Sequence, residues 1–224
     1  KIMAYILNIE TATKNCSVAI AQDGKTLLCK QIAESGYSHA EKLHVFIEEL
    51  LLELQLNYKD LNAIAVSQGP GSYTGLRIGI SAAKGLCYAL DIPLIAVDTL
   101  EILARQLQVS EGYIVPMIDA RRMEVYSAIF DAQYQKLRET QAEIITEDSF
   151  ATLEGTVYFV GDSTEKCAAT LTQPNFIFKD NIIYPSANEM SQLSDEKYKK
   201  NDTVDVAYFE PYYLKDFMIT ASKK

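Results

Sequence analysis

The segment that most constrains the fold is a glycine-rich junction with the sequence Ser67-Gln68-Gly69-Pro70-Gly71-Ser72-Tyr73-Thr74-Gly75-Leu76-Arg77. It follows an apolar, strand-like run at 63–66 and opens a helical pattern that continues to about Leu90. Two glycines around a proline make a tight turn, and the unpaired backbone N–H groups at a helix start can hold an anion. The spacing is not that of a Walker A loop, because Leu76-Arg77 follows Gly75. The residues alone therefore predict a strand–turn–helix junction, with phosphate binding as an alternative.

Apolar periodicity outside this junction predicts two successive α/β halves, which we expect to be domains at residues 1–98 and 99–224. In the first half, strand patterns occupy 5–10, 16–22, 25–33, 63–66 and 94–97, and helical patterns occupy 38–54 and 74–90. In the second half, strand patterns occupy 113–119, 124–130, 137–145, 157–160 and 182–184, helical patterns occupy 99–108, 164–172 and 185–193, and a polar stretch at 194–205 is expected to be a surface loop. Asp23-Gly24 predicts a hairpin turn, and Ser38 with Glu41 predicts a capping box.

Composition is that of a globular chain. Apolar residues make up 48% and charged residues 23%, no apolar run approaches the length of a membrane span, and no secretory leader pattern precedes the first strand. The four cysteines are scattered without a CxxC pair, which indicates small buried side chains in a reducing cytoplasm. The net charge is −9 with no clustered basic segment, so we do not expect the chain to bind a nucleic acid strongly by itself.

The two histidines do not form a zinc-binding helix motif. His39 and His44 are five residues apart, which separates them by about 140° around a helix with roughly 3.6 residues per turn. A zincin helix needs histidines four apart, so that both face one ion. We therefore expect no metal site and no peptidase chemistry; His39 is interpreted as a polar residue of the first helical turn, and His44 as a surface or interface residue.

The helix after the glycine-rich junction carries a row of small residues, Gly75, Gly79 and Ala83. A glycine inside a helix costs about 1 kcal/mol relative to alanine, so two glycines in one helix indicate a close approach by a neighbouring element. That neighbour is either a helix of a partner protein or the first helix of the same domain, and the residues alone do not decide between the two.

Three motifs together resemble the bacterial TsaB (YeaZ) family: the run at 67–77, Asn8-Ile9-Glu10-Thr11-Ala12-Thr13, and Asp119-Ala120-Arg121-Arg122-Met123-Glu124-Val125-Tyr126. The resemblance runs from about Ala4 to Lys215, where Pro211 to Lys215 is similar to a closing Pro-x-Tyr-Leu-Arg with lysine in place of arginine. It implies the two-lobed actin-like ATPase fold and a part in making threonylcarbamoyladenosine on tRNA.

The resemblance also implies that this chain is a non-catalytic partner of the transferase TsaD, with the ATPase TsaE as a further component. It implies no cofactor on this chain, since ATP and metal belong to the partner proteins, and contact with tRNA only through the complex. The two long helices of the first domain would pair with TsaD or with a second copy of the chain. The residues expected at that interface are His39, Leu43, Phe46, Ser72, Tyr73, Gly75, Arg77, Gly79 and Ala83.

Where actin-like ATPases hold a nucleotide, the resemblance implies a vestigial cleft that includes Glu10, Thr11, Asp119, Arg121 and Gly161. The family more usually carries aspartate at the position of Glu10, and the extra methylene displaces the carboxylate by about one bond length. The alternative for Glu10 is a strand-end acid that caps its turn, and the alternative for Asp119 and Arg121 is a local salt bridge. The alternative function is an ATP-binding, kinase-like or ATPase enzyme that uses this cleft.

Overall fold

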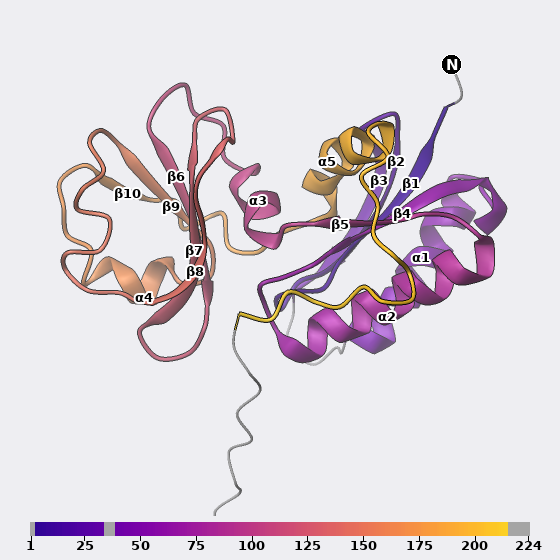
Figure 1. Cartoon of the computed structure of the whole chain (residues 1–224), viewed down its shortest axis with the longest axis horizontal. Helices are drawn as coiled ribbons and strands as arrows, with labels where there is room; N and C mark the ends of the chain where they lie inside the picture. The colour runs from indigo at the N-terminus through magenta and orange to yellow at the C-terminus, as the bar shows by residue number, and fades with distance from the viewer. Residues whose placement is uncertain (1–2, 34–38, 215–224) are drawn as a thin grey trace, which may run out of the picture.

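The computed structural model describes residues 3–33 and 39–214, and it consists of two lobes that lie side by side (Figure 1). Each lobe is built on a five-stranded sheet, with strand order β3-β2-β1-β4-β5 in the first and β10-β9-β6-β7-β8 in the second. In both sheets an antiparallel meander of three strands continues into strands that run parallel to its first member. The expected strand and helix order of the two halves is therefore present in the described part of the chain.

The first sheet contains β1 (Tyr5–Glu10), β2 (Cys16–Gln22), β3 (Lys25–Ile32), β4 (Leu61–Ser67) and β5 (Leu94–Val97). The turn between β2 and β3 is the predicted Asp23-Gly24 pair, and both residues have positive φ angles as a tight hairpin requires. Helices α1 (His39–Glu53) and α2 (Tyr73–Leu90) cover one face of this sheet, and α5 (Ala187–Lys199) covers the other (Figure 1). A short 3₁₀ turn at Tyr58–Asp60 precedes β4.

The second sheet contains β6 (Tyr113–Asp119), β7 (Glu124–Asp131), β8 (Lys136–Ile144), β9 (Val157–Val160) and β10 (Phe176–Phe178). Helix α3 (Thr99–Ala104) packs on one face of it, and α4 (Thr164–Ala168) follows β9. The other face is filled by an aromatic group in which the ring of Phe159 contacts three further phenylalanines. Helix α3 is shorter than the predicted 99–108.

Two predictions for the C-terminal third of the chain are wrong. Residues 182–184 form no strand, because the backbone there turns, with the N–H of Ile182 bonded to the carbonyl of Lys179, and the outer strand is β10 instead. The polar stretch from 194 is not a loop at its start, because α5 continues to Lys199 with Ser194 and Asp195 buried. The predicted capping box at Ser38 lies outside the described residues.

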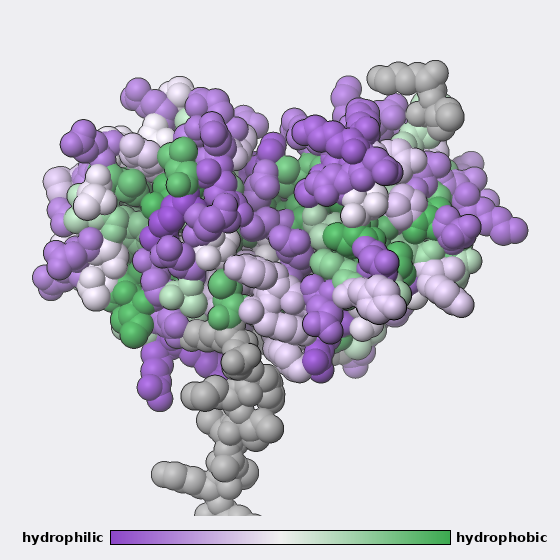
Figure 2. Space-filling model, viewed as in Figure 1, coloured by the Kyte–Doolittle hydropathy of each residue, from purple (hydrophilic) through white to green (hydrophobic). Residues whose placement is uncertain are grey.

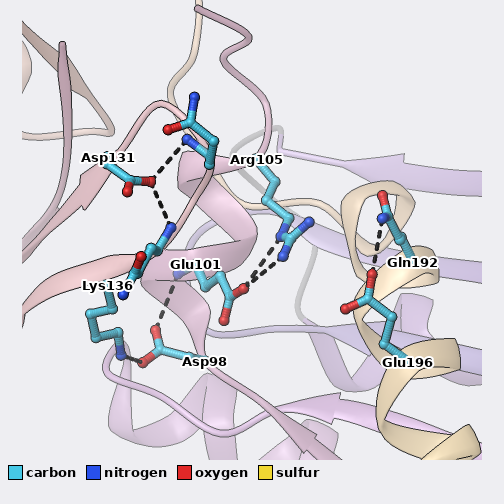
Figure 3. Close-up of polar contacts among 9 residues, drawn as sticks. Asp98, Glu101, Arg105, Asp131, Lys136, Gln192 and Glu196 are labelled. Atoms are coloured by element: carbon cyan, nitrogen blue, oxygen red, sulfur yellow. Dashed lines mark hydrogen bonds and ion pairs between the residues drawn. The ribbon is translucent and has the colours of Figure 1, made fainter. Parts of the chain in front are cut away.

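Asp98 is fixed at the junction where the chain passes from the first sheet to the second. Its side chain accepts hydrogen bonds from the backbone N–H groups of Leu100 and Glu101, and thereby caps α3. Its second oxygen lies 2.7 Å from Nζ of Lys136 on β8 (Figure 3). The Asp98 carboxylate, whose side chain is 13% exposed, therefore ties the junction to the second sheet.

The C-terminal part of the chain returns to the first lobe, a point that the sequence left open. Ala187, Met190 and Leu193 of α5 pack against the first sheet. The segment that follows α5, which we call the strap (residues 204–214), bonds to the edge of β5 through the N–H of Val204 and then runs beside α2 (Figure 1). The division into domains 1–98 and 99–224 stays a prediction. Residues after 98, namely those of α5 and the strap, pack on the first lobe.

Candidate functional site

A cleft of about 1170 Å³ lies between the two lobes. The first lobe lines it with the turn at 12–14, with His39 and with the glycine-rich junction at 70–74. The second lobe lines it with the β6–β7 hairpin and with Asp162, and the end of the strap closes one side. This is a volume in which a small molecule would fit, since such sites usually enclose about 300–1,000 Å³.

Glu10 does not line this cleft, although the family resemblance implied that it would. Its side chain is fully buried, and Oε1 accepts a hydrogen bond from the backbone N–H of Ala12 at 2.6 Å. Burial raises the pKa of this carboxyl to about 7, against the lowering effects of the Ala12 N–H bond and of the nearby Ser67 hydroxyl. Oε2 is buried as well and forms no hydrogen bond that the geometry of the described residues supports. The interpretation as a strand-end acid that caps its turn fits this geometry.

Thr11 is also buried, and its hydroxyl donates to the carbonyl of Gly75 at 2.8 Å. It therefore joins the end of β1 to the first turn of α2 and does not face the cleft. Gly161 is likewise structural: its φ is +117°, and a Cβ there would overlap the backbone carbonyl of Met117. Its neighbour Asp162 lines the cleft in its place.

The β6–β7 hairpin presents Asp119, Arg121 and Arg122 to the cleft, all of them exposed. Arg121 and Arg122 both have positive φ angles (75° and 53°), which is uncommon for residues with a side chain. Lys166 of α4 holds this tip, because its Nζ pairs with Asp119 and donates to the backbone carbonyls of Arg122 and Glu124. Asp119 thus forms its salt bridge with Lys166 and not with the guanidinium of Arg121, as the alternative had it. Arg121 contacts Asp119 through its backbone N–H, which donates to Oδ1 of Asp119.

Opposite the hairpin, Lys14 extends from the turn after β1, and Nε2 of His39 lies 2.7 Å from the carbonyl oxygen of Thr13. Asp162 accepts a hydrogen bond from the backbone N–H of Asp119 at 2.8 Å. Burial raises the pKa of Asp162, while Lys14 and Lys166 act in the opposite direction. Charges of both signs therefore line the cleft on its two sides.

The strap supplies the remaining wall with Tyr212, Tyr213 and Leu214. The N–H of Tyr212 donates to the carbonyl of Gln68 at 2.7 Å. The hydroxyl of Tyr213 accepts from Nε of Arg77 at 3.1 Å, and the guanidinium of Arg77 stacks 4.1 Å from the ring of Tyr73. Two of the expected interface residues, Tyr73 and Arg77, therefore contact the strap at Tyr213, and Arg77 stays exposed.

The small-residue row of α2 faces inward, which corrects its assignment to a partner contact. Gly75, Gly79 and Ala83 are buried. A Cβ on Gly75 would overlap the carbonyl oxygen of Thr11, and one on Gly79 would overlap the Thr11 hydroxyl. The close approach that two helical glycines indicate is real, but the neighbour is the end of β1 and neither a partner helix nor α1.

The other expected interface residues divide by exposure. Leu43 is fully buried in the first core, and Phe46 packs partly against the same core. Ser72 is exposed and caps α2, since its hydroxyl accepts from the N–H of Gly75 at 3.2 Å. His39 is half-buried beside the cleft.

The outward faces of α1 and α2 carry a different set of residues. Leu52 on α1 and Tyr88 on α2 are 79% and 86% exposed. Gly85 lies on the same side of α2, and a Cβ there would have nothing within 4 Å. Figure 2 shows hydrophilic residues over much of one face of both lobes, with apolar residues in smaller groups between them. Within residues 3–33 and 39–214, no helix is long and apolar enough to cross a membrane, and no group of three or more His, Cys, Asp or Glu side chains is placed to hold a metal.

Comparison with known proteins identifies the family. The chain is 30% identical over 220 residues to the tRNA threonylcarbamoyladenosine biosynthesis protein TsaB of Escherichia coli K12, and the match covers 94% of each chain. It is also 30% identical to the TsaB protein of Bacillus subtilis 168, over 94% of this chain and 93% of that one. The chain belongs to the TsaB family.

The fold and the wider relationship agree with this assignment. YeaZ from Pseudomonas aeruginosa superposes with a TM-score of 0.84 at 25% identity, over 95% of this chain and 100% of that one, and the two-lobed actin-like architecture is confirmed. A family model described as TsaD, tRNA N6-adenosine threonylcarbamoyltransferase, matches residues 33–218. The TsaB chain is therefore related to the transferase family as well.

Sequence reasoning missed several residues of the cleft, namely Lys14, Arg122, Asp162, Tyr212 and Tyr213. Asp162 directly follows Gly161, which was expected in the cleft, so the same motif contains the residue that lines it. Lys14 and the strap tyrosines carry no local pattern, because the cleft wall they form depends on how the chain returns from α5.

Proposed function

We propose that this chain is a non-catalytic subunit in the formation of N6-threonylcarbamoyladenosine on tRNA, where it binds the transferase TsaD and maintains it in an active state. The observation that carries this proposal is the match to TsaB proteins over 94% of both chains. Those relatives are named for the biosynthesis of this modified nucleoside. In this proposal TsaE is a further component of the complex, the location is the cytoplasm, and ATP and metal are held by the partner proteins.

The position of Glu10 supports a non-catalytic role. A carboxylate that orients a metal-bound water or a phosphate has to reach the ligand, and in this chain it is fully buried with one oxygen held by the N–H of Ala12. Thr11 is likewise engaged with α2. The two residues that the family resemblance placed at the nucleotide thus contribute to packing inside the first lobe.

The outward faces of α1 and α2 support the assignment of a partner surface. Large exposed side chains such as Leu52 and Tyr88 are the kind that become buried at interfaces, where aromatic residues are enriched. The partner in this proposal is TsaD, and a second copy of the chain is the alternative occupant of the same faces. Because the net charge is −9, tRNA is contacted through the complex.

An ATP-binding enzyme is the alternative function, and the interlobe cleft favours it. The cleft is large enough for a nucleotide, and Lys14, Arg121 and Arg122 are available to phosphate groups. Calorimetric titration of the chain with its cognate TsaD, and in parallel with Mg-ATP, separates the two. Binding of TsaD without a response to Mg-ATP supports the partner role, whereas tight binding of Mg-ATP without TsaD binding overturns it.

We expect Tyr88→Glu to weaken the association with TsaD at least about tenfold, because it places an unpaired charge in the apolar centre of the interface. The matched control is Ile144→Glu, which introduces the same charge at an apolar residue of the second lobe that is 68% exposed. The measurement is the Kd by calorimetry, with circular dichroism to check folding. Equal affinities of the two folded variants would contradict this position of the interface.

A further inference from the structure

The fold gathers cationic side chains of both lobes in the interlobe cleft, although the sequence contains no basic cluster. Lys14 comes from the turn after β1, and Arg121 and Arg122 come from the tip of the β6–β7 hairpin. All three are exposed. Within residues 3–33 and 39–214 their side chains form no hydrogen bond and no ion pair. In a chain with a net charge of −9, these unpaired cations are a local exception that an anionic ligand would complement.

The acidic side chains of the same lining do not pair with these cations. Asp119 is exposed, but its ion pair is with Lys166, which lies outside the described lining. Asp162 accepts from the backbone N–H of Asp119, and burial raises its pKa. Glu124 is half-buried. The exposed positive charge of the cleft is therefore available to a ligand.

The backbone that carries the two arginines is held in place before any ligand binds. Arg121 and Arg122 have φ angles of 75° and 53°. Nζ of Lys166 donates to the carbonyls of Arg122 and Glu124, and thereby fixes the tip of the hairpin on the cleft side. A fixed tip loses less entropy on binding than a mobile one would.

Aromatic rings lie beside the cations. Four of the described residues that line the cleft are tyrosines, at positions 73, 126, 212 and 213. Tyr212 is 46% exposed, and its backbone N–H is anchored to the carbonyl of Gln68 at 2.7 Å. Proteins that bind single-stranded nucleic acids combine a cationic groove with aromatic rings on which bases stack. The cleft has both components.

The glycine-rich junction does not form a phosphate-binding loop for a mononucleotide. Such a loop binds phosphate through free backbone N–H groups. Four of these groups in the junction are bonded inside the protein, namely those of Gln68, Gly69, Ser72 and Gly75. The cleft volume of about 1170 Å³ also exceeds the roughly 300–1,000 Å³ of small-molecule sites. Both observations favour a longer polyanion that is bound by side chains.

We propose that the interlobe cleft binds a single-stranded segment of RNA, with Lys14, Arg121 and Arg122 in contact with its phosphates. Tyr212 stacks on one of its bases. The RNA is the tRNA substrate, so this inference rests on the proposed function and deepens it: inside the complex, the chain makes a contact of its own with tRNA. Because the net charge of −9 repels RNA at a distance, TsaD has to bring the tRNA to the cleft.

The test measures RNA affinity by fluorescence anisotropy for the full chain in complex with saturating TsaD. The probes are a labelled tRNA transcript, a single-stranded RNA of about 12 nucleotides, and the same RNA as a duplex. We expect Lys14→Gln and Arg122→Gln each to weaken binding of tRNA and of the single strand at least about threefold. Each should also reduce the slope of log K against log salt by about 0.7. Tyr212→Leu should weaken binding of the single strand at least about fivefold.

Lys59→Gln and Tyr208→Leu are the matched controls. Lys59 is exposed in the 3₁₀ turn before β4, and Tyr208 is 84% exposed on the strap. Neither lines the cleft, so both variants should bind RNA as the parent chain does. Calorimetry gives the TsaD affinity of every variant, and circular dichroism verifies its folding, so that loss of RNA binding is distinguished from loss of the complex.

Unchanged RNA affinity of all three cleft variants, in a complex that still forms, would overturn this inference and leave the proposed function standing. Tighter binding of the duplex than of the single strand would also contradict it. So would tight binding of Mg-ATP by the chain alone that Arg122→Gln abolishes, because the cleft would then be a mononucleotide site. If the chain does not bind TsaD, the proposed function fails. RNA binding by the chain alone at low salt then decides: a loss in the cleft variants keeps the inference, and the absence of binding overturns it.

Discussion

Replacement of Gly75 by alanine should destabilise the first lobe by about 3 kcal/mol or more, the range of severe overpacking in a core. Gly75 is buried in the first turn of α2, and the new methyl group would overlap the backbone carbonyl oxygen of Thr11. That oxygen belongs to the end of β1, so relief requires movement of the helix or the strand. The measurement is the free energy of unfolding from urea denaturation.

Gly85→Ala is the matched control in the same helix. A Cβ at Gly85 would have no atom within 4 Å, so the substitution changes stability only through the helix propensity of the residue. Alanine is favoured over glycine in a helix interior by about 1 kcal/mol, and the variant should therefore be more stable than the parent chain by up to that amount. If both substitutions changed stability in the same direction, backbone propensity and not packing against Thr11 would govern this helix.

The same geometry changes what a Gly79→Leu variant can show. If this row of small residues formed a partner interface, leucine at Gly79 would weaken that interface while the chain stayed folded. Because a side chain at Gly79 would overlap the Thr11 hydroxyl inside the lobe, we expect this variant to lose stability first. The interface is therefore tested through Tyr88, which is exposed.

The helix α2 illustrates what periodicity does and does not predict. Apolar spacing and the glycine-rich junction located its start within one residue, and the close approach of a neighbour followed from the cost of two helical glycines. Periodicity shows which residues share a face, but it does not show which element covers that face. The identity of the neighbour, the end of β1, depends on the long-range packing of the first sheet.

Helix α5 shows how a buried helix with polar residues can be predicted as a loop. Its sequence is polar, and the apolar stripe that packs on the first sheet consists of Ala187, Met190 and Leu193, with the partly buried Tyr198 near the end of the helix. Directly after Leu193 come the buried residues Ser194 and Asp195. The Asp195 carboxylate lies beside Gly24 of the β2–β3 turn and pairs with Lys199, and the Ser194 hydroxyl donates to the carbonyl of Ser191. Polar residues that are buried by tertiary contacts have the same local pattern as a surface loop, so the sequence predicted a loop there.

The candidate site was predicted only in part, because its walls also depend on contacts between segments far apart in the sequence. Glu10 and Asp119 were expected at the cleft because the family resemblance implied it, and each is the last residue of its strand. Side chains alternate along β1, so Glu10 and Asn8 lie on the face of the sheet that α5 covers. The cleft is lined instead by the turn at 12–14, which follows β1. The walls contributed by the strap and by Lys14 depend on the path of the whole chain.

Glu10→Gln should make the chain more stable at pH 8, and the gain should disappear in acid. In the folded chain the pKa of Glu10 is about 7, against the ordinary glutamate value of 4.5. As the pH rises between these values, the unfolded chain loses the proton first, so the folded chain binds more protons and its stability falls. The stabilising effect of protonated Glu10 is fully present below about pH 4.5 and is lost as the pH passes 7. The difference of about 2.5 pKa units corresponds to about 3 kcal/mol at pH 8.

Glutamine avoids this loss because it is neutral at every pH and its oxygen can still accept from the N–H of Ala12. Its N–H₂ group also supplies donors close to the hydroxyl of Ser67. The measurement is the free energy of unfolding of parent and variant between pH 4.5 and 8, compared as a difference so that the other carboxyls cancel. Glu111→Gln, at an exposed position, is the control, and its difference should stay flat. A flat difference for Glu10→Gln as well would mean that Glu10 is ionised in the folded chain throughout, which requires a buried cation or ordered water beside it.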